Sequence, residues 1–269
     1  IIPKQKIKDF NTSWDIDFSY EIKNVGRYRI NIFRDNNGVG SVIRVIPSKI
    51  PTSEDLNLPE VLINFCKLSK GLLLVTGPTG SGKSTTLAAM IDWINKNRKE
   101  HILTIEDPIE FVHSQQKCLV NQREVGKHTD SFAKALRAAL REDPDIILVG
   151  ELRDLETTSI AIETAETGHL VMATLHTNTA ISTVDRIVDQ YPADQQRIIR
   201  NMLASSMKGV VSQTLCKKIG GGRCPAFEIL VMSDPVAAMI RENKIHMINN
   251  HMLTSQSEGN LQLNESLIN

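Results

Sequence analysis

The sequence predicts an α/β fold in which a small antiparallel sheet precedes a larger, mostly parallel sheet flanked by helices. From Gly71 onward, apolar runs of strand length alternate with segments of helical length, as expected for parallel strands joined by helical crossovers. Before residue 50, polar and apolar residues alternate as they do in half-buried strands. The stretch Pro47–Pro59 holds three prolines and separates the two patterns. We therefore expect a β-rich domain over residues 1–50, a linker over 51–59 and a second domain over 60–269.

Composition restricts the partners that this protein can have. Its 269 residues suffice for one large domain or two smaller ones, and 41% hydrophobic with 23% charged residues is typical of a soluble globular protein. Lys+Arg and Asp+Glu are equal at 31 each and aromatic residues make up 4%, so no nucleic acid partner is expected. The four cysteines form no C-x-x-C pair, which argues against a zinc ribbon and for reduced thiols in the cytoplasm. No apolar run approaches the ~20 residues that cross a bilayer, so membrane association is expected only through partners.

The elements of the first domain follow from its alternation. We expect three antiparallel strands, separated by turns at Asn24–Gly26 and Asp35–Gly38. The strands are Asp15–Ile22, Tyr28–Phe33 and Ser41–Ile46.

The elements of the second domain follow from its longer periodicity. Apolar runs predict strands at Leu72–Thr76, Ile102–Ile105, Ile146–Val149 and Leu170–Leu175. The segments between and after them predict helices at Ser84–Asn97, Ser131–Arg141, Glu156–Glu166 and Ile181–Asp189. A longer helix is expected over Ala193–Ser212, followed by a hairpin of Gln213–Lys218 and Ala226–Val231 around Gly220–Gly222. The stretch from Asp234 to Asn269 is helix-like at first and then weakly patterned.

A glycine-rich loop joins the first of these apolar strands to a helix. It matches the phosphate-binding pattern G-x-x-x-x-G-K-S/T at every fixed position, with the residues Gly77, Pro78, Thr79, Gly80, Ser81, Gly82, Lys83 and Ser84. Glycines let backbone N–H groups surround an anion, and the following helix, which Thr85 continues, adds the positive end of its dipole. Lys83 is expected to contact the β- and γ-phosphates of ATP, and the Ser84 hydroxyl to bind Mg²⁺.

Two acidic segments follow apolar strands. Glu151 ends the stretch Asp145–Glu151, after an apolar strand and at a position that lies beside the phosphate loop in such folds. It could bind Mg²⁺ through water or orient the water that attacks. Glu106, Asp107 and Glu110 form a second cluster, consistent with a divalent cation, a general base of raised pKa or a solvated acidic turn.

Two histidines bracket another buried strand. His169 precedes it and His176 follows it, so the two lie at opposite ends and do not form a joint metal site. His176 is at the carboxyl end, the edge where parallel sheets bind ligands, and could sense the γ-phosphate.

These four blocks, in this order and at these intervals, resemble the Walker A, Asp box, Walker B and His box of the secretion ATPases, which serve type IV pili and type II and type IV secretion. The residues of these motifs are most similar to those of the pilus-retraction branch of the family. The resemblance runs from about Asp15 to Arg241. It is most specific over Leu103–Phe111, Ala138–Asp145 and Ala165–His169.

The resemblance implies a RecA-like ATPase domain preceded by a PAS-like α+β domain, with ATP bound between them. It implies a homohexameric ring at the cytoplasmic face of the bacterial inner membrane, acting on a pilus platform protein. It makes Glu110 the water-activating base, with Glu106 and His169 as further catalytic candidates. Glu151 would support Mg²⁺ and water, and His176 would couple the γ-phosphate to domain motion. Family members also direct arginines of the first domain at ATP, for which Arg27, Arg29 and Arg44 are the candidates.

The sequence departs from the family pattern in three places, and four other functions are alternatives. Both ends of the chain are shorter than the family pattern, and Val236–Arg241 only loosely resembles the AIRAS motif of retraction ATPases. A motor for pilus extension or type II secretion is one alternative, although such relatives usually carry a tetracysteine zinc element; a type IV secretion ATPase is a second. A RecA-like nucleic-acid motor and a nucleotide-binding regulator without turnover come from other classes.

Overall fold

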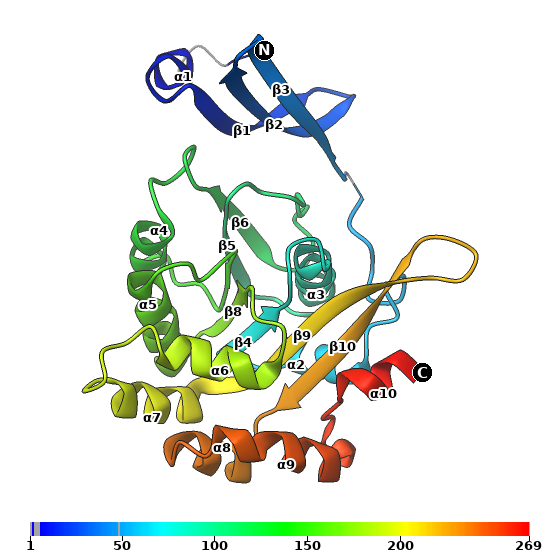
Figure 1. The fold of residues 1–269 in the computed structure, drawn as a ribbon, viewed down its shortest axis with the longest axis vertical. Helices are drawn as coiled ribbons and strands as arrows, with labels where there is room; N and C mark the ends of the chain where they lie inside the picture. Colours follow the sequence, from blue (N-terminus) through cyan, green and yellow to red (C-terminus); the bar gives the residue numbers. More distant parts are fainter. Residues whose placement is uncertain (1, 3–5, 48, 269) are drawn as a thin grey trace. The chain divides into compact units, whose positions relative to one another are not determined.

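The computed structural model describes residues 2, 6–47 and 49–268. It divides into two compact units (Figure 1), the first comprising Ile1–Ile50 with Pro108–Val112 and the second Pro51–Asp107 with His113–Asn269. None of the helices in the described ranges is both long and apolar enough to cross a bilayer.

The first unit is an antiparallel sheet with one short helix. Helix α1 (Ile7–Ser13) precedes strands β1 (Asp15–Ile22), β2 (Gly26–Asp35) and β3 (Gly38–Ile46), which pair in that order. The three predicted strands are confirmed. The helix was not predicted because its polar sequence buries only one side chain, that of Phe10. This ring completes a small core with four isoleucine and phenylalanine side chains from the sheet, namely Ile16, Phe18, Ile30 and Ile32.

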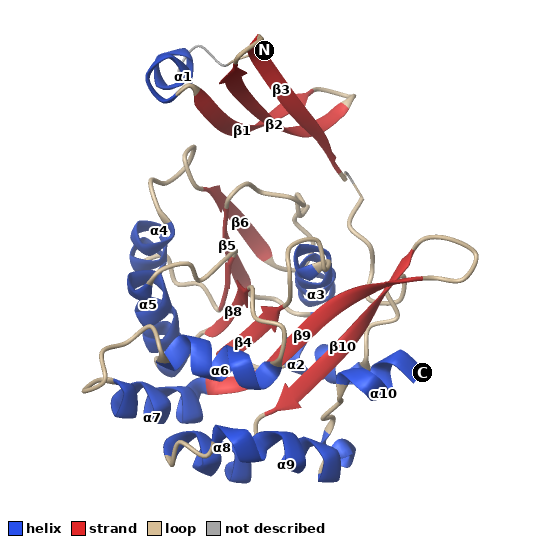
Figure 2. Ribbon diagram, in the orientation of Figure 1, coloured by secondary structure: helices blue, strands red, loops and turns tan. Residues whose placement is uncertain are grey.

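The second unit is built on a seven-stranded sheet, in the order β10-β9-β4-β8-β7-β5-β6. All neighbouring strands in it are parallel except β9 and β10, which form an antiparallel hairpin (Figure 2). The strands are β4 (Gly71–Thr76), β5 (His101–Glu106), β6 (Leu119–Glu124), β7 (Ile146–Val149), β8 (Leu170–Leu175), β9 (Met207–Lys217) and β10 (Arg223–Val231).

Successive residues of the central strands enter two different hydrophobic cores. In β4, Leu72 and Leu74 pack into one core and Leu73 and Val75 into the other, all of them fully buried. This follows from the two-residue period of a strand, which directs neighbouring side chains to opposite faces. A strand covered on both faces therefore reads as a continuous apolar run, which is why the sequence revealed these strands clearly.

Helices cover both faces of this sheet. One core includes side chains from α2 (Glu60–Cys66) and α3 (Lys83–Asn97). The other includes side chains from α4 (Phe132–Ala139), α5 (Leu155–Glu166), α6 (Ala180–Val188), α7 (Gln196–Ser206), α8 (Asp234–Arg241) and α9 (Ile248–Thr254). The last helix, α10 (Leu263–Ile268), packs beside β10 (Figure 1). The predicted α/β class, with a mostly parallel sheet after a small antiparallel one, is confirmed.

Two predictions of secondary structure need correction. The long helix expected over Ala193–Ser212 ends at Ser206, and β9 begins at Met207. The segment after Ser206 is a strand because it pairs with β4 on one side and β10 on the other. Its Gly209 permits the Phe65 ring to approach, since a Cβ there would lie 2.5 Å from the ring. Strand β6 was missed because it is a short edge strand with mostly polar residues.

Candidate nucleotide site at the carboxyl edge of the sheet

The glycine-rich loop connects β4 directly to α3. Lys83 is the first residue of this 15-residue helix and Gly82 is its N-cap. The Lys83 side chain is buried, and its Nζ donates hydrogen bonds to the carbonyl oxygens of Gly77 (2.8 Å) and Pro78 (3.2 Å). The ammonium group is therefore held against the loop backbone, at the positive end of the helix dipole.

Two glycines allow the loop to lie directly on β9. A Cβ added to Gly77, where φ is +138°, would lie 2.2 Å from the carbonyl oxygen of Gln213. A Cβ added to Gly82, where φ is +90°, would lie 2.8 Å from the Gln213 side-chain nitrogen. Both positions have a left-handed backbone that favours glycine, and at Gly77 the backbone of β9 also leaves no space for a Cβ.

The Gln213 side chain then holds the loop and the helix together. Its Nε2 donates to the carbonyl oxygen of Ser81 (2.7 Å), and its Oε1 accepts from the Thr86 hydroxyl (2.7 Å). Gln213 is only 4% exposed, so both bonds are shielded from water. No sequence pattern indicates this role. Gln213 lies far along the chain from the loop and reaches it only because β9 pairs with β4.

The loop fits a phosphate group. The hydroxyl oxygen of Ser81 is buried and has no hydrogen-bond partner among the residues that the structure describes. An unpaired buried hydroxyl is costly, and an anion in the loop would satisfy it. Lys83, the exposed Ser84 and the first N–H groups of α3 supply the remaining donors that a phosphate chain requires.

A chain of polar contacts links the loop to the neighbouring strand ends. Lys83 Nζ lies 3.5 Å from His176 Nδ1, and His176 Nε2 lies 3.0 Å from Glu151 Oε1. Lys83 can only donate, so Nδ1 must accept, and the Nε2 nitrogen then carries the proton that it donates to Glu151. His176 thus connects the phosphate-binding lysine to the acid, as an Nε2-protonated imidazole.

Arg153 and Asp107 extend this chain. Arg153 donates from Nε to Glu151 Oε2 (2.7 Å), and its Nη1 lies 3.3 Å from Asp107 Oδ2. The hydrogen bond to Glu151 raises the pKa of the Arg153 guanidinium, so the group stays charged. Asp107 belongs to the acidic cluster that the sequence pointed out, whereas Arg153 was not singled out, although it lies two residues after Glu151.

The strand order explains why these residues meet. His176 follows β8, Glu151 follows β7 and Asp107 follows β5, and these three strands are neighbours in the sheet. Carboxyl ends of parallel strands lie at one edge, so residues distant in sequence converge there. This edge carries the loop after β4 as well, because β4 pairs with β8.

Two acidic candidates have different surroundings. Glu106 is the last residue of β5, and its Oε1 accepts hydrogen bonds from Thr104 Oγ1 (2.6 Å) and Gln122 Nε2 (3.1 Å). Glu110 is half-buried and lies in Pro108–Val112, the segment that belongs to the first compact unit. Its part as a base stays a prediction.

The remaining candidates lie away from the phosphate loop or on the other unit. His169 precedes β8, at the opposite end from His176, and its Nδ1 lies 3.2 Å from the Thr164 carbonyl near the end of α5. The structure therefore does not bring His169 into the polar chain. In the first unit, Arg29 donates from Nε to Asp17 (3.0 Å) and lies opposite Arg44, whereas Arg27 lies opposite Ile46. A role for these arginines at ATP stays a prediction.

A mostly parallel α/β sheet, with a phosphate loop at the carboxyl end of one strand and an acid at the end of a strand nearby, defines a RecA-like P-loop nucleotide-binding protein. Residues 52–246 match the family model of type II/IV secretion system proteins. The chain belongs to this family.

Relatives of known identity resemble nearly the whole chain. The type IV pilus retraction ATPase PilT of Pseudomonas aeruginosa is 54% identical over 96% of this chain and 75% of its own length. A twitching motility protein of Neisseria gonorrhoeae is 51% identical over 97% of this chain and 70% of its own length. A crystal structure of the pilus retraction motor PilT with bound ADP matches with a TM-score of 0.90, at 46% identity, over 99% of this chain and 80% of that one.

Proposed function

We propose that this chain is a Mg²⁺-dependent ATPase that powers retraction of type IV pili. The observation that carries the ATPase function is the link from Lys83 through His176 to Glu151, which joins a phosphate-binding group to an acid that can act on water. The assignment to retraction is supported by the names of two relatives that are more than half identical over nearly all of the chain.

Each residue of the site has a separate task in this proposal. Lys83 and the loop N–H groups would hold the β- and γ-phosphates, and the exposed Ser84 hydroxyl would hold Mg²⁺ together with Glu151. When bound, Mg²⁺ supplies neutralisation of the charge that develops on the phosphates. Glu151 orients water at the strand end, and Arg153 fixes the direction of its carboxylate.

His176 couples nucleotide binding to the acid. A γ-phosphate that attracts Lys83 breaks the contact between Lys83 Nζ and His176 Nδ1. The imidazole can then turn toward the phosphate. Because the other nitrogen is bonded to Glu151, such a turn changes the position of the carboxylate. The presence of the γ-phosphate is thereby communicated from the loop to the neighbouring strand ends.

The first unit completes the mechanism in this proposal. Glu110 removes a proton from the attacking water, and one of Arg27, Arg29 and Arg44 contacts the nucleotide. The chain assembles as a homohexamer at the cytoplasmic face of the inner membrane and engages a platform protein of the pilus there. The family resemblance supports these parts.

Phosphate release from ATP and Mg²⁺ by the purified protein tests the enzymatic part. Lys83→Ala should abolish turnover because the phosphate charge loses its partner, and Glu151→Gln should slow it by about 10²-fold or more. Glu156→Gln is the matched control, because this exposed acid pairs with Arg137 on the surface. Normal turnover in Lys83→Ala would refute the site.

Deletion of the gene tests the cellular part. Cells without a retraction motor should carry more pili than wild-type cells and should not move by twitching. Cells that lose their pili instead would refute retraction and indicate a motor for extension. Stimulation of the purified ATPase by DNA or RNA would argue for a nucleic-acid motor.

A further inference from the structure

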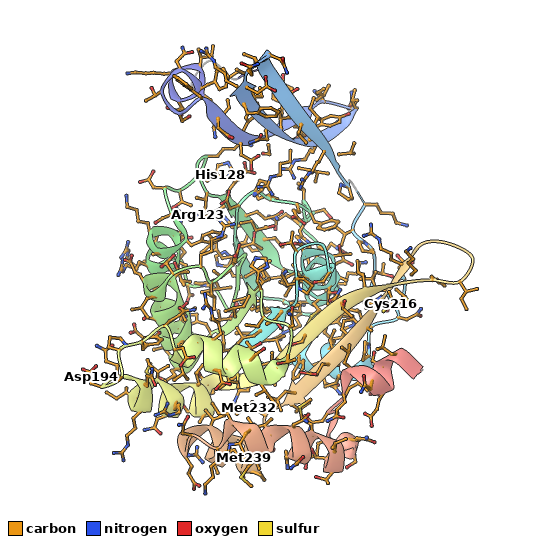
Figure 3. All side chains as sticks on the ribbon, in the orientation of Figure 1. Arg123, His128, Asp194, Cys216, Met232 and Met239 are labelled. Atoms are coloured by element: carbon orange, nitrogen blue, oxygen red, sulfur yellow. The ribbon has the colours of Figure 1, made fainter. Side chains whose placement is uncertain are left out.

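Two cysteines lie directly opposite each other in the hairpin of β9 and β10. Cys216 pairs with Cys224 in the antiparallel register, so both side chains project from the same face of the hairpin. Figure 3 shows Cys216 on the part of β9 that leads into the turn between the strands. The Cys224 sulfur lies 4.0 Å from the Cys216 carbonyl oxygen.

The hydrogen-bond pattern of the hairpin sets the distance between the Cα atoms of Cys216 and Cys224. Lys218 N donates to Gly222 O (3.1 Å), and Met232 N donates to Lys208 O (3.0 Å). Hydrogen-bonded pairs recur at every second residue, so Cys216 and Cys224 form such a pair, with Cα atoms about 5.5 Å apart. That distance falls inside the range of about 4.4–6.8 Å found in disulfides.

The other two cysteines are shielded from solution. Cys66 and Cys118 are both buried, and burial raises the pKa of the Cys66 thiol to about 12 and that of Cys118 above its usual value. By contrast, Cys224 is exposed and Cys216 is partly exposed. Thiol chemistry from solution is therefore directed to the hairpin pair.

The surroundings of the pair favour an anionic oxidant. Lys217 and Arg223 adjoin the two cysteines along their strands and project from the other face of the hairpin, and Lys218 lies directly after β9, before the exposed Gly220–Gly222. Oxidised glutathione is an anion at neutral pH, so these cations attract it.

We propose that Cys216 and Cys224 form a reversible disulfide by exchange with a low-molecular-weight disulfide such as oxidised glutathione. The Cys224 thiolate attacks one glutathione sulfur, forming a mixed disulfide and releasing one glutathione thiolate. The Cys216 thiolate then attacks the Cys224 sulfur, forming the Sγ–Sγ bond and releasing the second glutathione. Two protein thiols are oxidised, one glutathione disulfide is reduced, and the two protons pass to the released thiolates.

The bond would join β10 to β9, the strand on which the phosphate loop rests. Gln213, which holds Ser81 and Thr86, lies three residues before Cys216 on β9. A disulfide at the far end of the hairpin fixes the pairing of β9 with β10 and suppresses local opening of this strand. The inference concerns the thiols alone and does not rest on the proposed ATPase function.

The experiment treats the full chain with oxidised glutathione, denatures it and counts free thiols by maleimide labelling. The reduced chain has four cysteines and should bind four labels, whereas the oxidised chain should bind two and recover four after dithiothreitol. Cys66→Ser and Cys118→Ser should still lose two labels. Cys216→Ser should stop at a glutathione adduct on Cys224, which cannot resolve.

A second measurement distinguishes this bond from other oxidation products. Hydrogen exchange in β9 and β10 should slow in the oxidised chain and return to its former rate after reduction. Four labels after oxidation, a disulfide-linked dimer of two chains, or an oxidised chain that retains free Cys216 and Cys224 would each overturn the proposal.

Discussion

Replacing Gln213 by Met tests whether its side chain holds the phosphate loop in place. Methionine has a similar volume, so the substitution removes two hydrogen bonds without leaving a large cavity. It leaves the Ser81 carbonyl and the Thr86 hydroxyl without their partner, and both of these residues are buried. Each unsatisfied buried group costs about 1–3 kcal/mol, so the free energy of unfolding should fall by roughly 2–6 kcal/mol.

Part of this loss should appear in nucleotide binding. If the loop becomes free to take other conformations, a cost of about 1–3 kcal/mol in binding corresponds to roughly 5–150-fold weaker ATP affinity. Urea unfolding measures the first quantity, and titration with ATP measures the second. Gln195→Met is the control, because Gln195 is exposed and makes no side-chain cap to α7.

A double-mutant cycle with Thr86→Val isolates the hydrogen bond between the two side chains. When both partners are apolar, neither Oε1 nor the hydroxyl is left unsatisfied, so the double variant should be more stable than the sum of the single losses by about 1 kcal/mol. Strict additivity, or a Gln213→Met variant with wild-type stability and ATP affinity, would refute the role of Gln213.

The remaining predictions concern pH, the histidine link and the loop glycines. Burial lowers the pKa of His113 from 6.5 to about 4, so the unfolded chain takes up this proton first. The free energy of unfolding should therefore fall as the pH drops from about 6.5 to 4, by roughly 3 kcal/mol from this residue. That part of the pH dependence should vanish in His113→Gln. Urea unfolding at several pH values measures it, and the idea is wrong if the free energy of unfolding changes with pH in the variant as it does in the wild type. His176→Ala should lower kcat by up to about 10²-fold while ATP affinity changes little, because it breaks the link between Lys83 and Glu151. Phosphate-release kinetics measure this, and a kcat equal to that of the wild type would contradict it. Gly77→Ala should abolish ATP binding, because its Cβ would meet the Gln213 carbonyl at 2.2 Å. Gly80→Ala is the matched control: its φ is also positive but nothing lies within 4 Å, so only the left-handed backbone cost of roughly 1–2 kcal/mol remains. Equal ATP affinity in the two glycine variants would show that the close approach to β9 has no importance.

Local sequence patterns determined most of the elements and the phosphate loop. The central strands of the large sheet are buried on both faces, so their apolar runs were unambiguous, and the loop pattern is contiguous along the chain. The strands of the small sheet were visible because one of their faces meets a core and the other meets solvent.

Tertiary structure decided which distant residues share the site. The segment after Ser206 became a strand through its pairing with β4, against a helical interpretation of its sequence. The same pairing carried Gln213 under the phosphate loop, and nothing in the sequence around Gln213 indicates that neighbour. Strand order likewise joined Arg153 and Asp107 to the chain that begins at Lys83.

This difference arises because local structure depends on residues close in the sequence, whereas strand order depends on the whole chain. Periodicity, turns and the loop motif depend on neighbours within a few residues, so the sequence alone determined them. The order of strands in a sheet depends on which pairs bury the most surface together, and this is a property of the whole chain. The phosphate loop was therefore evident from its residues, whereas the groups that hold it and connect it to the acid were evident only from the fold.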